Sequence, residues 1–158
     1  MRLVSVDPGV KLTLKNLTVT EGFSSGFASG IYNRGTLEVI NSNSTFSGNT
    51  SFQGGGIYNA GGTLRVISST FSGNTLSGDG IANFGAEAAL RNTNMADDPS
   101  GQNCVVFTES PFTDGRYNIS NDGSCNFDGS TSRNNTDPKL ASGLAIMAVR
   151  PDHSPAKG

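Results

Sequence analysis

The chain has 158 residues, of which 34% are hydrophobic and 15% charged, and its formal net charge is −2. These values argue for one folded domain, against a membrane-inserted or disordered chain, and against nucleic acid as a partner, because basic residues do not cluster. Gly, Ser, Asn and Thr number 21, 20, 16 and 14, which argues against long amphipathic helices, because these residues favour turns and strand edges.

The first residues, Met1–Gly9, lack the apolar segment of a secretory signal peptide. Either the protein is cytoplasmic or a signal was lost together with an upstream segment, and the family resemblance described below favours the second alternative. Leu3–Val6 supply at most one short strand before the first full coil. We therefore expect this end to fray or to support end-to-end self-association, since open strand edges can pair with another molecule.

One motif recurs in three places along the chain. Gly-Ile-Tyr-Asn occupies 30–33 and 56–59, and Gly-Ile-Ala-Asn occupies 80–83, so that the isoleucines are 26 and then 24 residues apart. Ser-Thr-Phe-Ser-Gly-Asn-Thr at 44–50 recurs at 69–75, a spacing of 25. Two different motifs that share one period indicate a repeat architecture.

Each repeat opens with an alternation of apolar and polar residues. Leu-x-Leu at 12–14, Leu-x-Val at 37–39 and 64–66, and Ala-x-Leu at 88–90 have the period of two that is typical of a strand with one buried face. Short strands joined by Gly, Asn and Ser turns predict one coil of a parallel β-solenoid per repeat. We therefore expect an all-β fold, a parallel β-helix of about three to four coils with an irregular C-terminal cap.

Stacked coils would align equivalent residues in files with a spacing of about 4.8 Å. The predicted core files are Leu12, Leu37, Leu64 and Ala88; Leu14, Val39, Val66 and Leu90; and Val19, Phe46, Phe71 and Met95. An outward file carries Glu38 and Arg65. For this pair we predict a solvated cross-strand ion pair and no catalytic role.

The polar positions that recur with the same period are predicted to be structural. Asn tolerates left-handed backbone angles in turns and can bond its amide to the turn above. The predicted Asn ladders comprise Asn33, Asn59 and Asn83 and, at a second corner, Asn49 and Asn74. Gly54–Gly56 are interpreted as positions that need a positive φ or a close approach of coils, because no helical pattern follows them as in a phosphate loop.

Two segments carry a family resemblance. Gly-Gly-Gly-Ile-Tyr-Asn at 54–59, paired with Phe-Ser-Gly-Asn at 46–49 and 71–74, resembles the repeats of polymorphic outer-membrane and autotransporter-like proteins. The later residues 114–127 and 134–140 resemble the end of bacterial secreted β-helix proteins of the choice-of-anchor type. The resemblance covers about residues 12–140 and implies a right-handed parallel β-helix with a surface or adhesive role. The close of the chain departs from the family pattern after Leu140.

The organisation that we predict has three parts within one domain. Residues 1–103 form the coils, 104–140 a C-terminal region, and 141–158 a tail. Cys104 and Cys125 lie in the middle part, and an even cysteine count in a chain of secreted appearance predicts a disulfide between them. Such a bond would clamp the C-terminal region to the last coil and stabilise the fold by about 3 kcal/mol.

Few groups of residues in the sequence could form a catalytic or metal site. Asp97 and Asp98 form a local acidic pair, and Asp79 would lie about one coil away. Their spacing matches no calcium loop and Asp-Asp-Pro is typical of a turn, so these three residues are weak metal candidates only. His153 stands in a Pro-flanked tail, and no nucleophile motif is present. We predict no catalytic residue and no cofactor.

Three functions fit the sequence. The favoured one is a non-catalytic, secreted or cell-surface module for structural display or adhesion, which binds a glycan or a surface protein, without a direct membrane span. The alternative is a carbohydrate-active enzyme, a polysaccharide lyase or a glycoside hydrolase of the β-helix type, whose site would be formed by coils absent here. An ice-binding solenoid is the least favoured, because it needs regular outward Thr-x-Thr rows and Thr18-x-Thr20 alone has that pattern.

Overall fold

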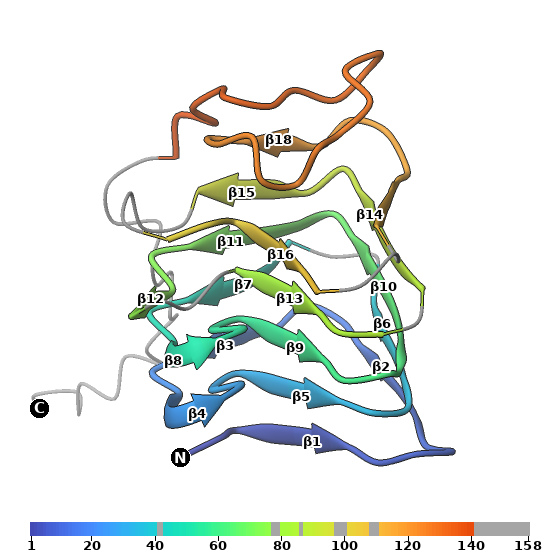
Figure 1. Ribbon diagram of the computed structural model, residues 1–158, viewed down its shortest axis with the longest axis vertical. Helices are drawn as coiled ribbons and strands as arrows, with labels where there is room; N and C mark the ends of the chain where they lie inside the picture. Colours follow the sequence, from blue (N-terminus) through green and yellow to red (C-terminus); the bar gives the residue numbers. More distant parts are fainter. Residues whose placement is uncertain (41–42, 77–79, 86, 97–100, 108–110, 141–158) are drawn as a thin grey trace, which may run out of the picture.

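A computed structural model describes residues 1–40, 43–76, 80–85, 87–96, 101–107 and 111–140. Within these ranges the chain forms eighteen short strands and no helix, and every strand pair is parallel. The strands stack into a parallel β-solenoid of about four turns, which confirms the predicted fold class. Figure 1 shows the coils one above another, with the N-terminus at one end of the stack.

The first three coils contribute strands to four sheets, which we call A to D, and the later strands extend sheets A to C only. Sheet A contains β1 (Val4–Val6), β5 (Ile31–Asn33), β9 (Ile57–Asn59), β13 (Ile81–Asn83) and β16 (Cys104–Val106). Sheet B contains β2 (Lys11–Leu14), β6 (Thr36–Val39), β10 (Thr63–Ile67), β14 (Ala88–Arg91) and β17 (Phe112–Asp114). Sheet C contains β3 (Thr18–Thr20), β7 (Ser44–Ser47), β11 (Ser69–Ser72), β15 (Asn94–Ala96) and β18 (Ile119–Ser120). The short sheet D contains β4 (Phe23–Phe27), β8 (Thr50–Gln53) and β12 (Thr75–Leu76).

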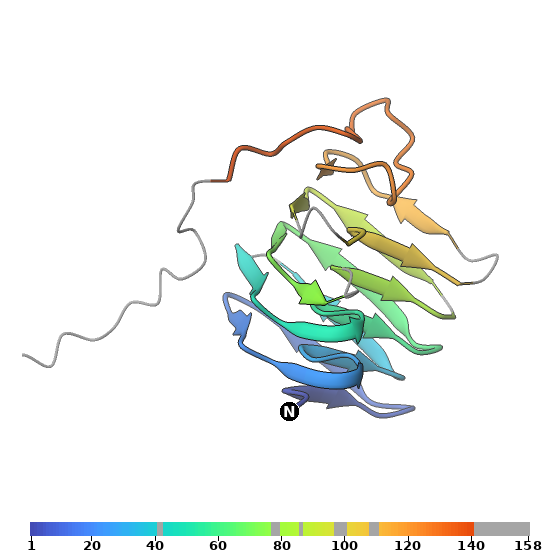
Figure 2. The same cartoon turned by 60° about the vertical axis from the view of Figure 1, so that its left-hand side comes forward.

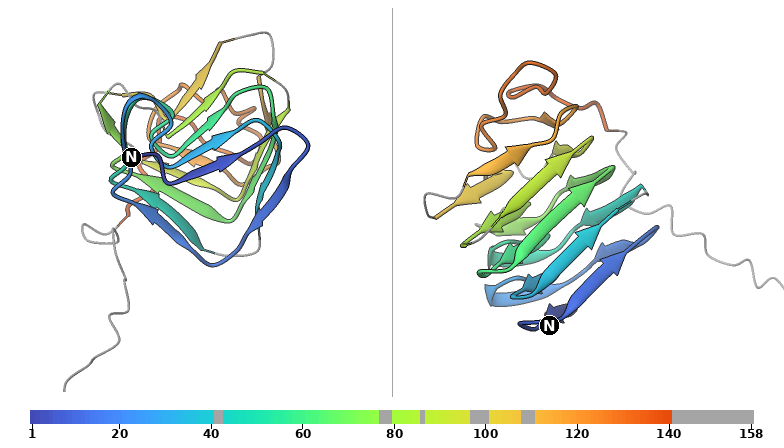
Figure 3. Two further views of the ribbon diagram at one scale, coloured as in Figure 1. Left: turned by 90° about the horizontal axis from the view of Figure 1, so that it is seen from below. Right: turned by 90° about the vertical axis from the view of Figure 1, so that its right-hand side faces the viewer.

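The core lies inside the coils, where the sheets face one another (Figure 3). The register pairs Leu12 with Leu37 and Leu37 with Leu64, and it aligns Phe46 with Phe71 in sheet C. The two phenylalanine rings stack with centroids 4.6 Å apart and an interplanar angle of 4°. Side chains of one kind therefore repeat along the axis, so each coil offers its neighbour a surface of matching shape.

The first coil is less well buried than the later ones. Leu12 and Leu14 are half-buried, whereas Leu37 and Val39 in the next coil are fully buried. The cause is geometric, because β1 to β4 are the edge strands of their sheets and have a neighbour on one side within the described residues. Leu12 and Leu14 thus occupy the predicted files without the predicted burial.

The C-terminal region is more regular at its start than the sequence suggests. β16, β17 and β18 add one further strand to sheets A, B and C. The irregular part begins after Ser120, and residues 121–140 lie over the end of the stack opposite the N-terminus (Figure 2). A disulfide joins Cys104 on β16 to Cys125 in this irregular part, with the two Cα atoms 4.8 Å apart. It ties the covering segment to the last coil.

Two glycines show why the repeat needs them. Gly54 has a φ of 63°, in the left-handed region that favours glycine. A Cβ atom on Gly56 would lie 2.5 Å from the carbonyl oxygen of Gly80 and 2.8 Å from the ring of Phe71. The coils therefore approach closely at Gly56, and no side chain fits there.

In the described part of the chain, no helix is long and apolar enough to cross a membrane.

Candidate binding surface

The outer face of sheet A carries an aromatic file. In the repeated Ile-Tyr-Asn strand, Ile57 and Asn59 point inward and are fully buried, so alternation directs Tyr58 outward. The register places Tyr58 beside Tyr32 of the preceding coil. Their rings stack with centroids 5.5 Å apart and an interplanar angle of 10°.

Two phenylalanines continue the file where the tyrosine repeat stops. Ala82 replaces tyrosine at the third occurrence of this strand motif, and the ring of Phe84, just after β13, stacks on Tyr58 at 5.0 Å. Phe107, just after β16, stacks on Phe84 at 3.9 Å. The small side chain of Ala82 leaves room for Phe84 over Tyr58.

Phe27 at the end of β4 completes the group, with its ring 4.9 Å from that of Tyr58. We call Phe27, Tyr32, Tyr58, Phe84 and Phe107 the aromatic strip. At one end of the strip, the guanidinium of Arg2 lies 4.2 Å from the centroid of Tyr32 and donates a hydrogen bond to the carbonyl oxygen of Phe27. A cation over an aromatic face is attracted by the ring quadrupole, so Arg2 covers this end of the strip.

The strip has a sealed centre and an exposed rim. Tyr58 is 5% exposed, whereas Phe27 and Phe107 are each 45% exposed. Burial raises the pKa of the Tyr58 hydroxyl, and the neighbouring Tyr32 raises it further, so this side chain stays neutral. The strip is therefore an uncharged apolar surface, bordered by Arg2 and by Arg34, which forms an ion pair with Asp7.

The Asn residues form ladders inside the turns. Asn33 donates to the side-chain oxygen of Asn59 at 2.7 Å, and Asn59 donates to that of Asn83 at 2.8 Å. At the second corner, Asn49 donates to the side-chain oxygen of Asn74 at 3.0 Å. All five side chains are fully buried, so they hold coils together and are not available to a ligand.

Glu38 has a different partner from the one predicted. Arg65 is its register neighbour, but the ion pair runs from Glu38 to Lys11 at 3.0 Å, and Thr13 donates a hydrogen bond at 3.3 Å. The hydrogen bond and charge of Lys11, together with Thr13 and the charge of Arg65, lower the pKa of Glu38. Lys11 lies diagonally across the strands, and its long, flexible side chain reaches Glu38 from there.

Two acidic residues of the described chain, Asp114 and Asp122, are held by structural hydrogen bonds near the cap. Asp114 accepts from Asn118 and Ser132, each at 2.7 Å, and Asp122 accepts from the Ser124 hydroxyl at 2.7 Å. Burial alone would raise the pKa of each Asp, but these and further hydrogen bonds outweigh it and lower both pKa values. Asp114 and Asp122 therefore anchor the cap through these hydrogen bonds.

The weak metal candidates Asp79, Asp97 and Asp98 lie outside the described residues, as does His153. Among the residues that the structure describes, no three His, Cys, Asp or Glu side chains gather as a metal site would require.

The outer face of sheet C carries hydroxyl groups. The register aligns Thr18, Thr45 and Thr70 in one file. The adjacent file consists of Thr20, Ser47 and Ser72, and Ser47 is 1% exposed. The threonine file therefore extends beyond Thr18 to Thr45 and Thr70. In the adjacent file, serine replaces threonine at positions 47 and 72.

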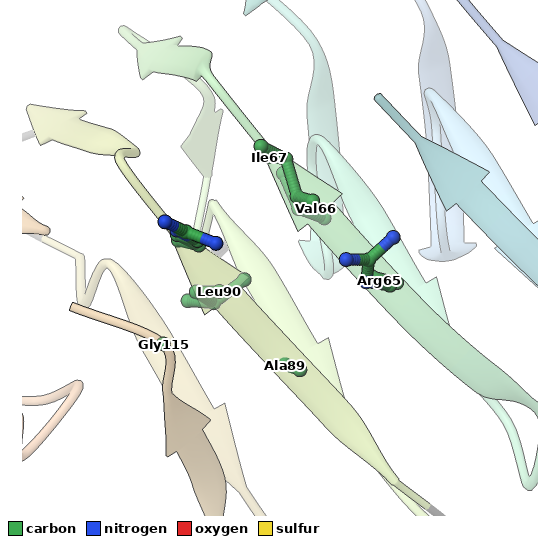
Figure 4. Close-up of a pocket in the computed structure, with 7 residues that line it drawn as sticks. Arg65, Val66, Ile67, Ala89, Leu90 and Gly115 are labelled. Carbon is green, nitrogen blue, oxygen red and sulfur yellow. The ribbon is translucent and has the colours of Figure 1, made fainter. Parts of the chain in front are cut away.

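The outer face of sheet B has a shallow depression of about 220 Å³ (Figure 4). Arg65 on β10 and Arg91 on β14 line it, and it is hollow because Ala89 and Gly115 present little or no side chain. Neither guanidinium has an ion pair within 4.0 Å among the described residues. The site can attract an anion, although exposed charges are strongly screened by water and salt.

Comparison of the chain with protein-family models, curated proteins and solved structures finds no match. The binding surface must therefore be interpreted from its own geometry.

The aromatic strip was not predicted from the sequence, although two of its five residues could have been. Tyr32 and Tyr58 stand between two inward residues of a recurring strand, so alternation alone could have placed both on one outer face. Phe27, Phe84 and Phe107 follow no period, since they lie at or beyond strand ends. Their convergence depends on the turn geometry.

Proposed function

We propose that this chain is a non-catalytic β-helix module of a secreted or cell-surface protein, which adheres to a partner protein through the aromatic strip. The observation that carries the proposal is the exposed rim of Phe27 and Phe107 beside an aromatic file whose central ring, Tyr58, is buried and whose Tyr32 and Phe84 rings are half-buried. Exposed apolar patches mark interaction sites. Aromatic and Arg residues are enriched in protein–protein interfaces, and Arg2 borders the strip.

A protein fits this surface better than a sugar. Sugar rings stack on open aromatic faces, whereas the faces of Tyr58 are covered by Tyr32 and Phe84. One face of Phe84 is likewise covered by Phe107. The strip offers ring edges and apolar rims, which suit the side chains of a protein surface.

An oxidising compartment is supported by the disulfide between Cys104 and Cys125, since disulfides persist mainly in secreted and surface proteins. The resemblance of the repeats to those of polymorphic outer-membrane and choice-of-anchor proteins favours the same location. The commitment of Asp114 and Asp122 to cap hydrogen bonds favours a binding role over the enzymatic alternative.

The experiment is a binding screen of the fluorescently labelled chain on a printed array of secreted and surface proteins. We expect bound spots that disappear for the double variant Phe27→Ser/Phe107→Ser and persist for Phe52→Ser. Phe52 is a matched control because it is 51% exposed and stacks on no aromatic ring of the described chain. An array without bound protein, or spots that the double variant retains, would overturn the proposal.

A further inference from the structure

A second depression, separate from the aromatic strip, lies on the outer side of sheet C next to the cap. Its volume is about 280 Å³, and its lining includes Asn94 on β15, Ile119 on β18, and Tyr117, Thr131 and Arg133. Ile119 and Arg133 form an isolated parallel bridge, so the cap segment runs beside the last strand of the sheet. The site therefore forms where the cap meets the solenoid.

Tyr117 is displayed by an unusual backbone. Arg116 has a φ of 81° and Tyr117 a φ of 59°, so two consecutive non-glycine residues adopt left-handed angles. The turn is fixed by its neighbours, because Asn92 donates to the carbonyl oxygen of Arg116 at 3.0 Å and Asp114 accepts from the Arg116 amide at 2.9 Å. Nothing in this turn requires an aromatic side chain, and glycine would fit it best.

The ring of Tyr117 has no structural task that would explain it. It is 56% exposed and stacks on no other aromatic ring among the described residues. Unfavourable backbone angles that present an exposed side chain are typical of ligand sites. Unlike Tyr58, Tyr117 keeps an open ring surface.

Hydrogen-bonding groups surround this ring. The described chain supplies no hydrogen-bond partner to the Asn94 amide group, the Thr131 hydroxyl or the Arg133 guanidinium. Together they offer donors and acceptors, and Ile119 adds an apolar contact. An aromatic ring beside an amide, a hydroxyl and a guanidinium matches the two kinds of surface of a pyranose, an apolar C–H face and a rim of hydroxyl groups.

We propose that this depression binds a pyranose unit of a glycan, with Tyr117 against the sugar ring and Asn94, Thr131 and Arg133 bonding its hydroxyl or carboxylate groups. This inference does not depend on the protein partner of the aromatic strip. It adds a glycan site at the cap end of the molecule.

The test uses a printed array of neutral and uronate-containing oligosaccharides, followed by titration of the strongest ligand by calorimetry. We expect at least tenfold weaker binding for Tyr117→Gly and Tyr117→Ala, and unchanged binding for Arg116→Gln and for Phe27→Ser/Phe107→Ser. Arg116 is a close control, because it is an exposed neighbour of Tyr117 that does not line the depression. Arg133→Gln is expected to weaken uronate ligands more than neutral ones.

The melting temperature of Tyr117→Gly separates binding from folding. We expect it to equal or exceed that of the wild type, because glycine adopts a φ of 59° without strain. An array without a bound sugar, unchanged affinity in Tyr117→Gly, or a lowered melting temperature of that variant would overturn the proposal.

Discussion

Asn59 shows how one polar side chain connects three coils. It accepts a hydrogen bond from Asn33 of the preceding coil at 2.7 Å and donates to Asn83 of the following coil at 2.8 Å. It also donates to the carbonyl oxygen of Gly62 at 2.7 Å, inside its own turn. Because Asn59 is fully buried, water cannot replace these bonds.

We predict that Asn59→Ala lowers the free energy of unfolding by about 2–3 kcal/mol, because buried groups that lose a partner cost about 1–3 kcal/mol each. Urea unfolding followed by circular dichroism measures this change. Asn43→Ala is the control, since Asn43 is exposed. Equal midpoints for the two variants would show that the ladder does not stabilise the coils.

The hydrogen bonds of Asp122 predict that the stability of the cap decreases in acid. Burial would raise its pKa, but hydrogen bonds from Ser124, from the backbone of Asn103 and from Ser120 together lower it below the usual value. A lowered pKa in the folded state contributes stability above the unfolded pKa, which for Asp is about 3.9. That contribution disappears as the pH falls through the folded pKa.

We therefore expect the melting temperature of the wild type to fall more steeply below about pH 4 than that of Asp122→Asn, which cannot titrate at this position. Scanning calorimetry across this range measures both. If the melting temperatures of the two proteins fell equally with pH, Asp122 would not anchor the cap. Asp7→Asn serves as the control, because Asp7 is exposed and follows β1 at the opposite end of the solenoid.

At the level of the elements, the rings of Phe46 and Phe71 in sheet C stack 4.6 Å apart and are fully buried in the core. We predict that Phe71→Ala lowers the free energy of unfolding by about 3–5 kcal/mol, because the coils above and below hold their positions and leave a cavity. Glu38→Ala, on the outer face of sheet B, should leave the denaturation midpoint nearly unchanged. Similar losses for both variants would mean that inward and outward files are exchanged.

The elements differ in how far the sequence predicts them. Sheets B and C follow from the alternation at Leu37–Val39 and from the repeated Phe46 and Phe71, because period and burial agree there. β16 to β18 were not predicted, since their residues lack the repeat motif, although Cys104 and Phe112 join the same buried core. The sequence also did not predict which charged side chains form ion pairs, as the pair of Lys11 and Glu38 shows. The aromatic strip and the Tyr117 depression both depend on turn geometry, which periodicity does not specify.

At the scale of the whole molecule, the two ends of the solenoid are unequal. Residues 121–140 cover one end, whereas β1 to β4 are edge strands with half-buried Leu12 and Leu14 at the other. Strands with fewer buried contacts open at lower free energy. We expect amide exchange around residues 1–20 to be faster than around 56–75, as measured by mass spectrometry. Uniformly slow exchange from Leu3 onward would show that this end is a closed cap.

The rim of the aromatic strip, as proposed above, serves binding and not folding. The most direct test is the affinity of the double variant Phe27→Ser/Phe107→Ser for the array-identified protein, measured beside its urea midpoint. We predict a dissociation constant at least tenfold higher, as is usual for interface hot spots, with a midpoint close to that of the wild type. An unchanged dissociation constant, or a loss of affinity that only accompanies unfolding, would contradict the claim.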